Sequence, residues 1–132
     1  MSKGFERNQE HLAQLNALGR ELTRRAKSKC EFCNSAGKKL IIYEAIITKQ
    51  TVNIDHCLFI CEDCLTLLQH PPKHNPSQLH FLSTTIWNDT PIVKALAIAQ
   101  VQKLAPVLPW AQELLDSVYL EPEIQDLIAQ LK

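Results

Sequence analysis

The sequence predicts an α+β fold in which a β-hairpin and the short helix after it pack with further α-helices on either side. Three observations support this prediction: residues 6–27 carry apolar side chains at helical spacing, residues 40–47 and 57–60 are apolar without such spacing, and helical patterns return from Pro91 onward. With 132 residues, 45% of them hydrophobic, the chain is long enough for one modest core.

The N-terminal helix is predicted by an apolar stripe whose members lie three or four residues apart: Leu12, Leu15, Leu18, Leu22 and Ala26. Gly19 lies inside this stripe, and glycine within a helix costs about 1 kcal/mol relative to alanine. We therefore expect the helix to be weakest at Gly19 and to end near Lys27.

Four of the five cysteines form two Cys-x-x-Cys pairs, Cys30 with Cys33 and Cys61 with Cys64. Two residues between thiolates let one tight turn aim both sulfurs at a single ion, so the pairs predict one tetrahedral Zn²⁺ site. Structural zinc contributes about 10–16 kcal/mol, comparable to the whole net stability of a small domain. Two redox motifs or a pair of disulfides are the alternatives, although no strand-helix thioredoxin pattern frames either pair.

The segment between the cysteine pairs predicts a hairpin. Turn-forming residues at 34–37 precede a predicted strand at 40–47, and residues 57–60 form the second arm. Leucines after Cys64 predict a helix that ends at Pro71 and Pro72. A cysteine turn, a hairpin and a helix opened by the second cysteine pair make a treble-clef-like zinc module, whereas zinc ribbons lack the helix.

The rest of the chain predicts a polar loop and a helical cap. Residues 69–80 are polar, and Thr90 with Pro91 marks the start of a mostly buried helix that Pro106 and Pro109 end. Further helices are expected at 110–120 and from Glu121 to Leu131. The predicted organisation is residues 1–29 as a basic helix, 30–70 as the four-cysteine zinc module, 71–85 as a linker or loop, and 86–132 as the cap.

Charge is distributed unevenly although the net charge is zero. Residues 20–39 hold seven basic and two acidic side chains, whereas residues 104–132 hold five acidic side chains and Lys132. The basic cluster predicts a nucleic-acid surface formed by Arg20, Arg24, Arg25, Lys27 and Lys29. One alternative is that the basic residues form a solvated helix face. Another is a protein partner or self-association, through the apolar helices and the tryptophans Trp87 and Trp110, if these do not belong to the core.

The N-terminus has no apolar signal segment, and no apolar run reaches membrane-spanning length. An odd fifth cysteine, Cys57, would be a liability in an oxidising compartment. We therefore expect a cytoplasmic protein without a membrane partner, and Cys57 as a small core residue.

Several segments resemble the N-terminal cysteine-rich region of the proteobacterial PhnA (alkylphosphonate-utilisation) family. They include Cys30-Glu31-Phe32-Cys33, residues 55–64, Ile86-Trp87-Asn88-Asp89-Thr90-Pro91 and residues 110–120. The resemblance runs from about Glu21 to Glu123 and implies a zinc module. The β-rich PhnA domain into which such proteins often continue has no counterpart before Lys132.

An enzymatic role is less strongly predicted than a binding role. HNH-type nucleases also use a treble clef, but they need histidines on the hairpin, where residues 42–46 have none and His56 alone lies nearby. Four cysteine ligands leave no open position on a metal, and His70, His74 and His80 fit no regular ligand motif. A zinc module that binds nucleic acid or protein is therefore expected, with a degenerate HNH-like nuclease or a phosphonate-related enzyme as the alternative.

Overall fold

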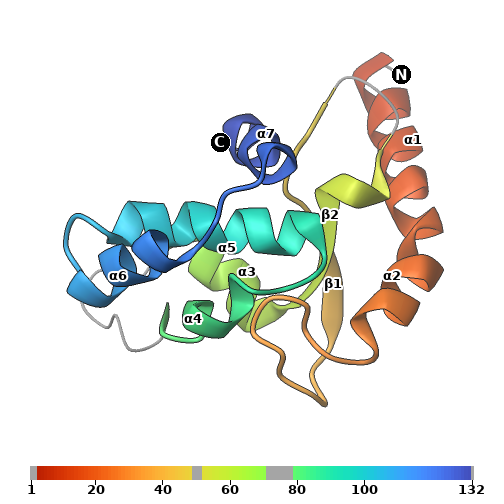
Figure 1. Ribbon diagram of the computed structural model, residues 1–132. Helices are drawn as coiled ribbons and strands as arrows, with labels where there is room; N and C mark the ends of the chain where they lie inside the picture. The colour runs from red at the N-terminus through yellow and green to blue at the C-terminus, as the bar shows by residue number, and fades with distance from the viewer. Residues whose placement is uncertain (1–2, 49–51, 71–78, 132) are drawn as a thin grey trace.

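The computed structural model describes residues 3–48, 52–70 and 79–131 (Figure 1). It confirms the α+β class. The elements in chain order are α1 (Lys3–Ala17), α2 (Gly19–Ala26), β1 (Leu40–Glu44), η1 (Ile54–His56), β2 (Cys57–Cys61), α3 (Glu62–Gln69), α4 (Leu82–Thr85), α5 (Pro91–Leu104), α6 (Pro109–Ser117) and α7 (Pro122–Gln130). In the described part of the chain, no helix is both long and apolar enough to cross a membrane.

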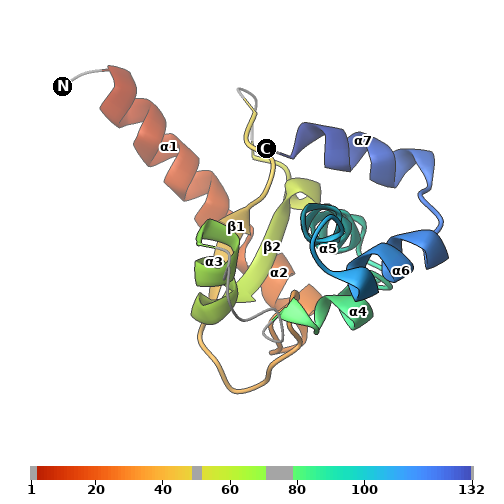
Figure 2. The same ribbon diagram turned by 90° about the vertical axis from the view of Figure 1, so that its left-hand side faces the viewer.

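The hairpin and α3 form the treble-clef-like module that the order of cysteine turn, hairpin and helix predicts. β1 and β2 pair antiparallel from Leu40 opposite Cys61 to Glu44 opposite Cys57. Two strands alone are marginally stable in water, so the hairpin depends on packing against helices. Figure 2 shows it between α3 and the C-terminal helices, and α2, α3 and α5 all contact β2. Accordingly, four of the five β2 residues are buried.

The first strand is three residues shorter than predicted. It ends at Glu44. The Ala45 amide still donates to the His56 carbonyl oxygen at 2.9 Å, but the chain bends at Ala45 and leaves the strand. Ile46 is then buried in the core while Ile47 is 74% exposed. The isoleucine-rich pattern at 45–47 therefore reflects the burial of Ile46 by the core and not pairing in the sheet.

The single N-terminal helix that we predicted is two helices, with the break at Leu18 next to Gly19. The Leu18 amide bonds to the Leu15 carbonyl oxygen at 3.0 Å, a tighter turn than an α-helix. A Cβ at Gly19 would meet no atom within 4 Å, so this glycine acts through its low helix propensity and not through packing. Only α2 buries its stripe, at Leu22 and Ala26, and α1 extends away from the C-terminal helices (Figure 2).

The C-terminal helices pack around α5, which contacts α4, α6 and α7 as well as β2. This central position explains why seven of its residues are buried: Ile92, Val93, Ala95, Leu96, Ala97, Ile98 and Val101. Proline stands at the start of α5, α6 and α7, as its missing amide and fixed φ favour. α6 ends at Ser117, before the predicted Leu120, because Val118 is already extended.

The structure adds two details to the predicted connection at 71–85 and to the start of α5. The second half of the predicted linker holds α4, and Leu79, Leu82 and Thr85 are buried there. Thr90 precedes α5 as predicted but makes no side-chain cap bond. Pro71, Pro72 and His74 lie outside the described residues.

Candidate metal centre

The first cysteine pair lies in a tight turn between α2 and β1. The Asn34 amide donates to the Cys30 carbonyl oxygen at 2.8 Å, and the Cys33 amide reaches the Cys30 Sγ at 3.4 Å. Asn34 adopts a left-handed conformation with φ of 67°, which asparagine tolerates better than most residues. The turn therefore aims both sulfurs to one side.

The second pair lies where β2 meets α3. Cys61 is the last residue of β2 and occupies the N-cap position of α3, and Cys64 lies in the first turn of that helix. The partial positive charge of a helix N-terminus stabilises thiolate charge there. The Cys61 amide also donates to the Cys30 Sγ at 3.4 Å, which links the two pairs directly.

The fold brings all four predicted ligands to one point. Their Sγ atoms lie within 4.8 Å of one another, with Cys30 to Cys64 at 3.6 Å and Cys33 to Cys61 at 3.8 Å. Tetrahedral coordination with metal–sulfur bonds of about 2.3 Å separates the sulfurs by about 3.8 Å. A disulfide needs about 2 Å, and all five cysteines are free. The four cysteines can therefore hold a metal ion.

Without a cation the four thiols share protons unequally. Hydrogen bonds from Cys64 and from backbone amides hold the pKa of Cys30 at about 4, against the opposing effect of burial. The hydrogen bond to that Cys30 thiolate, together with burial, raises the pKa of Cys64, and burial raises the pKa of Cys61. Only a cation of charge two or more would allow all four sulfurs to ionise together.

A partly buried ion pair ties the first turn to the rest of the module. Arg25 Nε and Nη2 donate to the two Glu31 carboxylate oxygens at 2.7 and 2.8 Å, and the Phe59 amide donates to the same carboxylate at 2.8 Å. Arg25 Nη2 also donates to the Cys57 carbonyl oxygen at 2.6 Å. This clamp between Arg25 and Glu31 joins α2, the first turn and β2. Nothing in the cysteine spacing indicated it.

The five predicted nucleic-acid residues therefore separate into two groups. The Arg25 guanidinium is bonded within the protein, whereas Arg20, Arg24, Lys27 and Lys29 are exposed. Two of these lie on the exposed side of α2, and two flank the turn that follows it.

The other residues that the sequence analysis named have ordinary structural surroundings. Cys57 is fully buried, as expected for a core residue, and burial raises its pKa to about 11. His56 is half-buried in η1. His80 stacks near Trp110, with ring centroids 4.9 Å apart, and His70 is exposed at the end of α3. In the described part of the chain, none of these three histidines belongs to a cluster that could hold a metal.

A second pair that the sequence did not indicate joins α1 to the hairpin. His11 Nε2 lies 2.7 Å from the Glu44 carboxylate, and the Gln14 carboxamide accepts a bond from the Val52 amide at 3.1 Å. The residues are 33 and 38 positions apart, so no local pattern could have revealed the contacts. They hold α1 beside the module.

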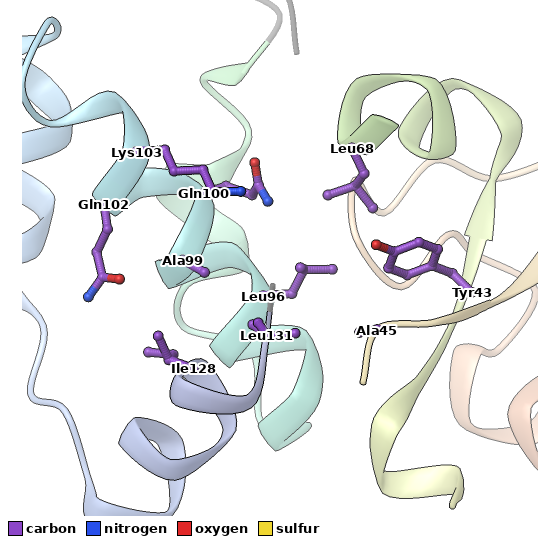
Figure 3. A pocket seen from close by; sticks show the side chains of 10 residues that line it. All are labelled: Tyr43, Ala45, Leu68, Leu96, Ala99, Gln100, Gln102, Lys103, Ile128 and Leu131. Carbon is purple, nitrogen blue, oxygen red and sulfur yellow. The ribbon is translucent and has the colours of Figure 1, made fainter. Parts of the chain in front are cut away.

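A pocket of about 310 Å³ separates the module from the cap. Figure 3 shows Tyr43 of β1 facing Leu96 and Gln100 of α5 across it, with Lys103 at the same end. Among the described residues that line it there is no carboxylate, histidine or cysteine. Burial raises the pKa of Tyr43, so its phenol is neutral at pH 7.

Comparison with known proteins gave no match to a family model, a curated protein or a solved structure. Fold and site together define the class: a small α+β protein with a treble-clef-like hairpin and helix around four cysteines that can bind a metal.

The raised pKa values predict proton release on metal binding. Cys61 and Cys64 are protonated thiols at pH 7 without a cation, so Zn²⁺ must displace at least two protons and bind more weakly as the pH falls. Isothermal titration of the metal-free protein in buffers of different ionisation enthalpy measures this number. An apparent enthalpy that does not change between buffers would contradict the prediction.

The clamp predicts a graded loss of stability. Arg25→Ala leaves the nearly buried Glu31 carboxylate without its cation and should cost about 3 kcal/mol of unfolding free energy. Arg25→Lys keeps the charge but loses the bidentate geometry, so it should cost less. Denaturant unfolding in the presence of metal measures both, with exposed Arg24→Ala as the control at under about 0.5 kcal/mol. Equal effects of Arg25→Ala and Arg24→Ala would show that the clamp does not stabilise the fold.

Proposed function

We propose that Cys30, Cys33, Cys61 and Cys64 hold one structural Zn²⁺ ion and that the protein is a nucleic-acid-binding module. A tetrahedral set of four thiolates is the donor set that zinc prefers, with iron as the other metal that accepts it. Three of the four sulfurs are on buried residues, and four protein ligands leave no position for water or substrate. The metal would therefore supply rigidity and not catalysis.

One observation carries the choice of nucleic acid as the partner. Of the seven basic side chains between residues 20 and 39, Arg25 is bonded to Glu31 and Lys38 to Asp63, and the others are exposed. These five are Arg20, Arg24, Lys27, Lys29 and Lys39. Exposed cations that have no acidic partner in the described part of the chain remain available for phosphates.

The separation of acidic and basic residues also supports binding of a polyanion at one surface and not over the whole molecule. The acidic residues Glu113, Asp116, Glu121, Glu123 and Asp126 are exposed on or beside α6 and α7. They repel phosphates from that end of the molecule. A polyanion would then be drawn to α2 and the first cysteine turn, although the net charge is zero.

The enzymatic alternatives have less support. An HNH-like nuclease needs a histidine on the hairpin to activate water, and β1 and β2 carry none. The nearest candidates, His56 and the His11–Glu44 pair, have no further metal-binding cluster around them in the described part of the chain. A phosphonate-related enzyme would need a catalytic site, and the described residues that line the pocket of Figure 3 include no carboxylate, histidine or cysteine.

The zinc assignment predicts different results for the cysteines. Cys64→Ala should abolish metal binding and unfold the module, because structural zinc sites contribute about 10 kcal/mol or more. Cys57→Ala should retain one metal per chain and lose only the core contacts of a small side chain. Elemental analysis of each purified variant, with circular dichroism before and after chelation, tests this. A visible iron–thiolate absorption, or full metal content in Cys64→Ala, would contradict the assignment.

Nucleic-acid binding predicts a strong dependence on salt. Binding of fluorescein-labelled oligonucleotides should weaken steeply with salt, and Arg20→Ala with Arg24→Ala should reduce the slope of log affinity against log salt by about 2. Fluorescence anisotropy measures both, and Lys103→Ala, which removes an exposed lysine of α5, is the matched control. An affinity that is independent of salt and of Arg20 and Arg24 would instead favour a protein partner.

A further inference from the structure

A groove of about 580 Å³ lies beside the first cysteine turn, between two segments far apart in the sequence. We call it the knuckle groove. Residues 25–34 contribute Lys27, Lys29 and Asn34, and residues 84–90 contribute Trp87 and Asn88. Its lining combines two lysines with a tryptophan.

Trp87 is held in an exposed position by buried neighbours. Its side chain is 53% exposed, although Thr85 and Ile86 immediately before it are buried. Thr85 Oγ1 donates to the Phe32 carbonyl oxygen at 2.6 Å, and Phe32 packs edge-on against Phe81 with ring centroids 5.5 Å apart. These contacts fix the backbone at Trp87 against the first cysteine turn. About half of a large aromatic side chain is thereby presented to solvent from a backbone position that tertiary contacts hold.

The chain after Trp87 is equally well fixed. The Asn88 carboxamide oxygen accepts a bond from the Thr90 amide at 2.8 Å, and Pro91 starts α5 immediately afterward. The position of the indole therefore does not depend on a loose loop. A ligand that stacks on it would lose little entropy from ordering the protein.

The two lysines of the groove lie on a segment that contains two left-handed backbone conformations. Lys27 and Ser28 both adopt left-handed conformations, with φ of 54° and 65°, where glycine would be favoured over a side chain. Lys27 nevertheless stands at the first of these positions, and both Lys27 and Lys29 are exposed at the groove. Arg25 and Glu31 also line it but neutralise each other, which leaves Asp89 as its one carboxylate without a cationic partner in the described part of the chain.

An exposed indole beside two lysines suits a base and its phosphates, because every base has a face that can stack on an aromatic ring. In duplex DNA or RNA the bases already stack on each other, so an indole can reach a base face only in a single strand. A positively charged groove with an aromatic side chain on which bases stack is the combination with which proteins bind single strands. Amide groups of Asn34 and Asn88 can also hydrogen-bond base edges.

We infer that the knuckle groove binds single-stranded nucleic acid, with one base stacked on Trp87 and the adjoining phosphates at Lys27 and Lys29. The inference rests on the proposed function and narrows its ligand from nucleic acid in general to unpaired strands.

The test uses the full-length, metal-loaded protein and an oligo(dT) of about 10 nucleotides, a length within the range that one small domain covers. In a Trp110→Phe background Trp87 is the only tryptophan, so its fluorescence should be quenched as oligo(dT) binds. A duplex of the same length should bind more weakly and quench less. Polyphosphate should compete for the lysines without quenching. Oligo(U) in parallel shows whether RNA is preferred to DNA.

Variants separate stacking from stability. Trp87→Ala should weaken oligo(dT) binding about tenfold, the loss of one stacked base, while Trp87→Phe should restore most of the affinity. Tyr119→Ala, which removes an aromatic side chain that is 75% exposed outside the groove, should change nothing. Lys27→Gly should weaken binding while keeping or raising the melting temperature, because glycine suits its φ, and Ser28→Gly should affect only the melting temperature.

The outcomes distinguish the groove assignment from the proposed nucleic-acid binding in general. Salt-sensitive binding of oligo(dT) with no quenching of Trp87 and no effect of Trp87→Ala would overturn the groove assignment and leave the basic surface of the proposed function intact. Failure to bind either single strands or duplex at low salt would overturn both. Quenching by oligo(dT), loss in Trp87→Ala and recovery in Trp87→Phe are the results expected.

Discussion

The meeting of four sulfur atoms at one point is the constraint on which the rest of this structure depends. Two strands of five residues and a helix of eight residues have little stability of their own. The two cysteine pairs connect the chain before the hairpin to the start of α3, and a bound cation would close both connections at once. The hairpin register follows, because Cys61 must lie at the end of β2 and at the start of α3 together.

The clamp between Arg25 and Glu31 adds a second constraint to the same turn. Glu31 stands between Cys30 and Cys33, so the placement of the first cysteine turn also places its carboxylate. Its bonds to Arg25 and to the Phe59 amide fix that turn against α2 and β2. A metal holds the sulfurs but does not orient the backbone around them, and here a charged side-chain pair supplies that orientation.

A binding role follows more naturally from this arrangement than a catalytic one. The Arg25 guanidinium is paired with Glu31 inside the clamp, whereas the other basic side chains of α2 and of the turn after it are exposed. The same turn forms one side of the groove that exposes Trp87. The four-cysteine centre and the proposed recognition surface are therefore built from the same segment of the chain.

The sequence by itself determined which four cysteines come together, the order of hairpin and helix, and the starts of the C-terminal helices, because cysteine spacing, β-branched runs and proline positions act locally. It did not determine where β1 ends, since core burial of Ile46 decided this, and for residues 6–27 it indicated a weak point at Gly19 but not two separate helices. Only the tertiary structure turned Arg25 inward and left Trp87 exposed, because both depend on residues far away in the chain, Cys57 and Phe32.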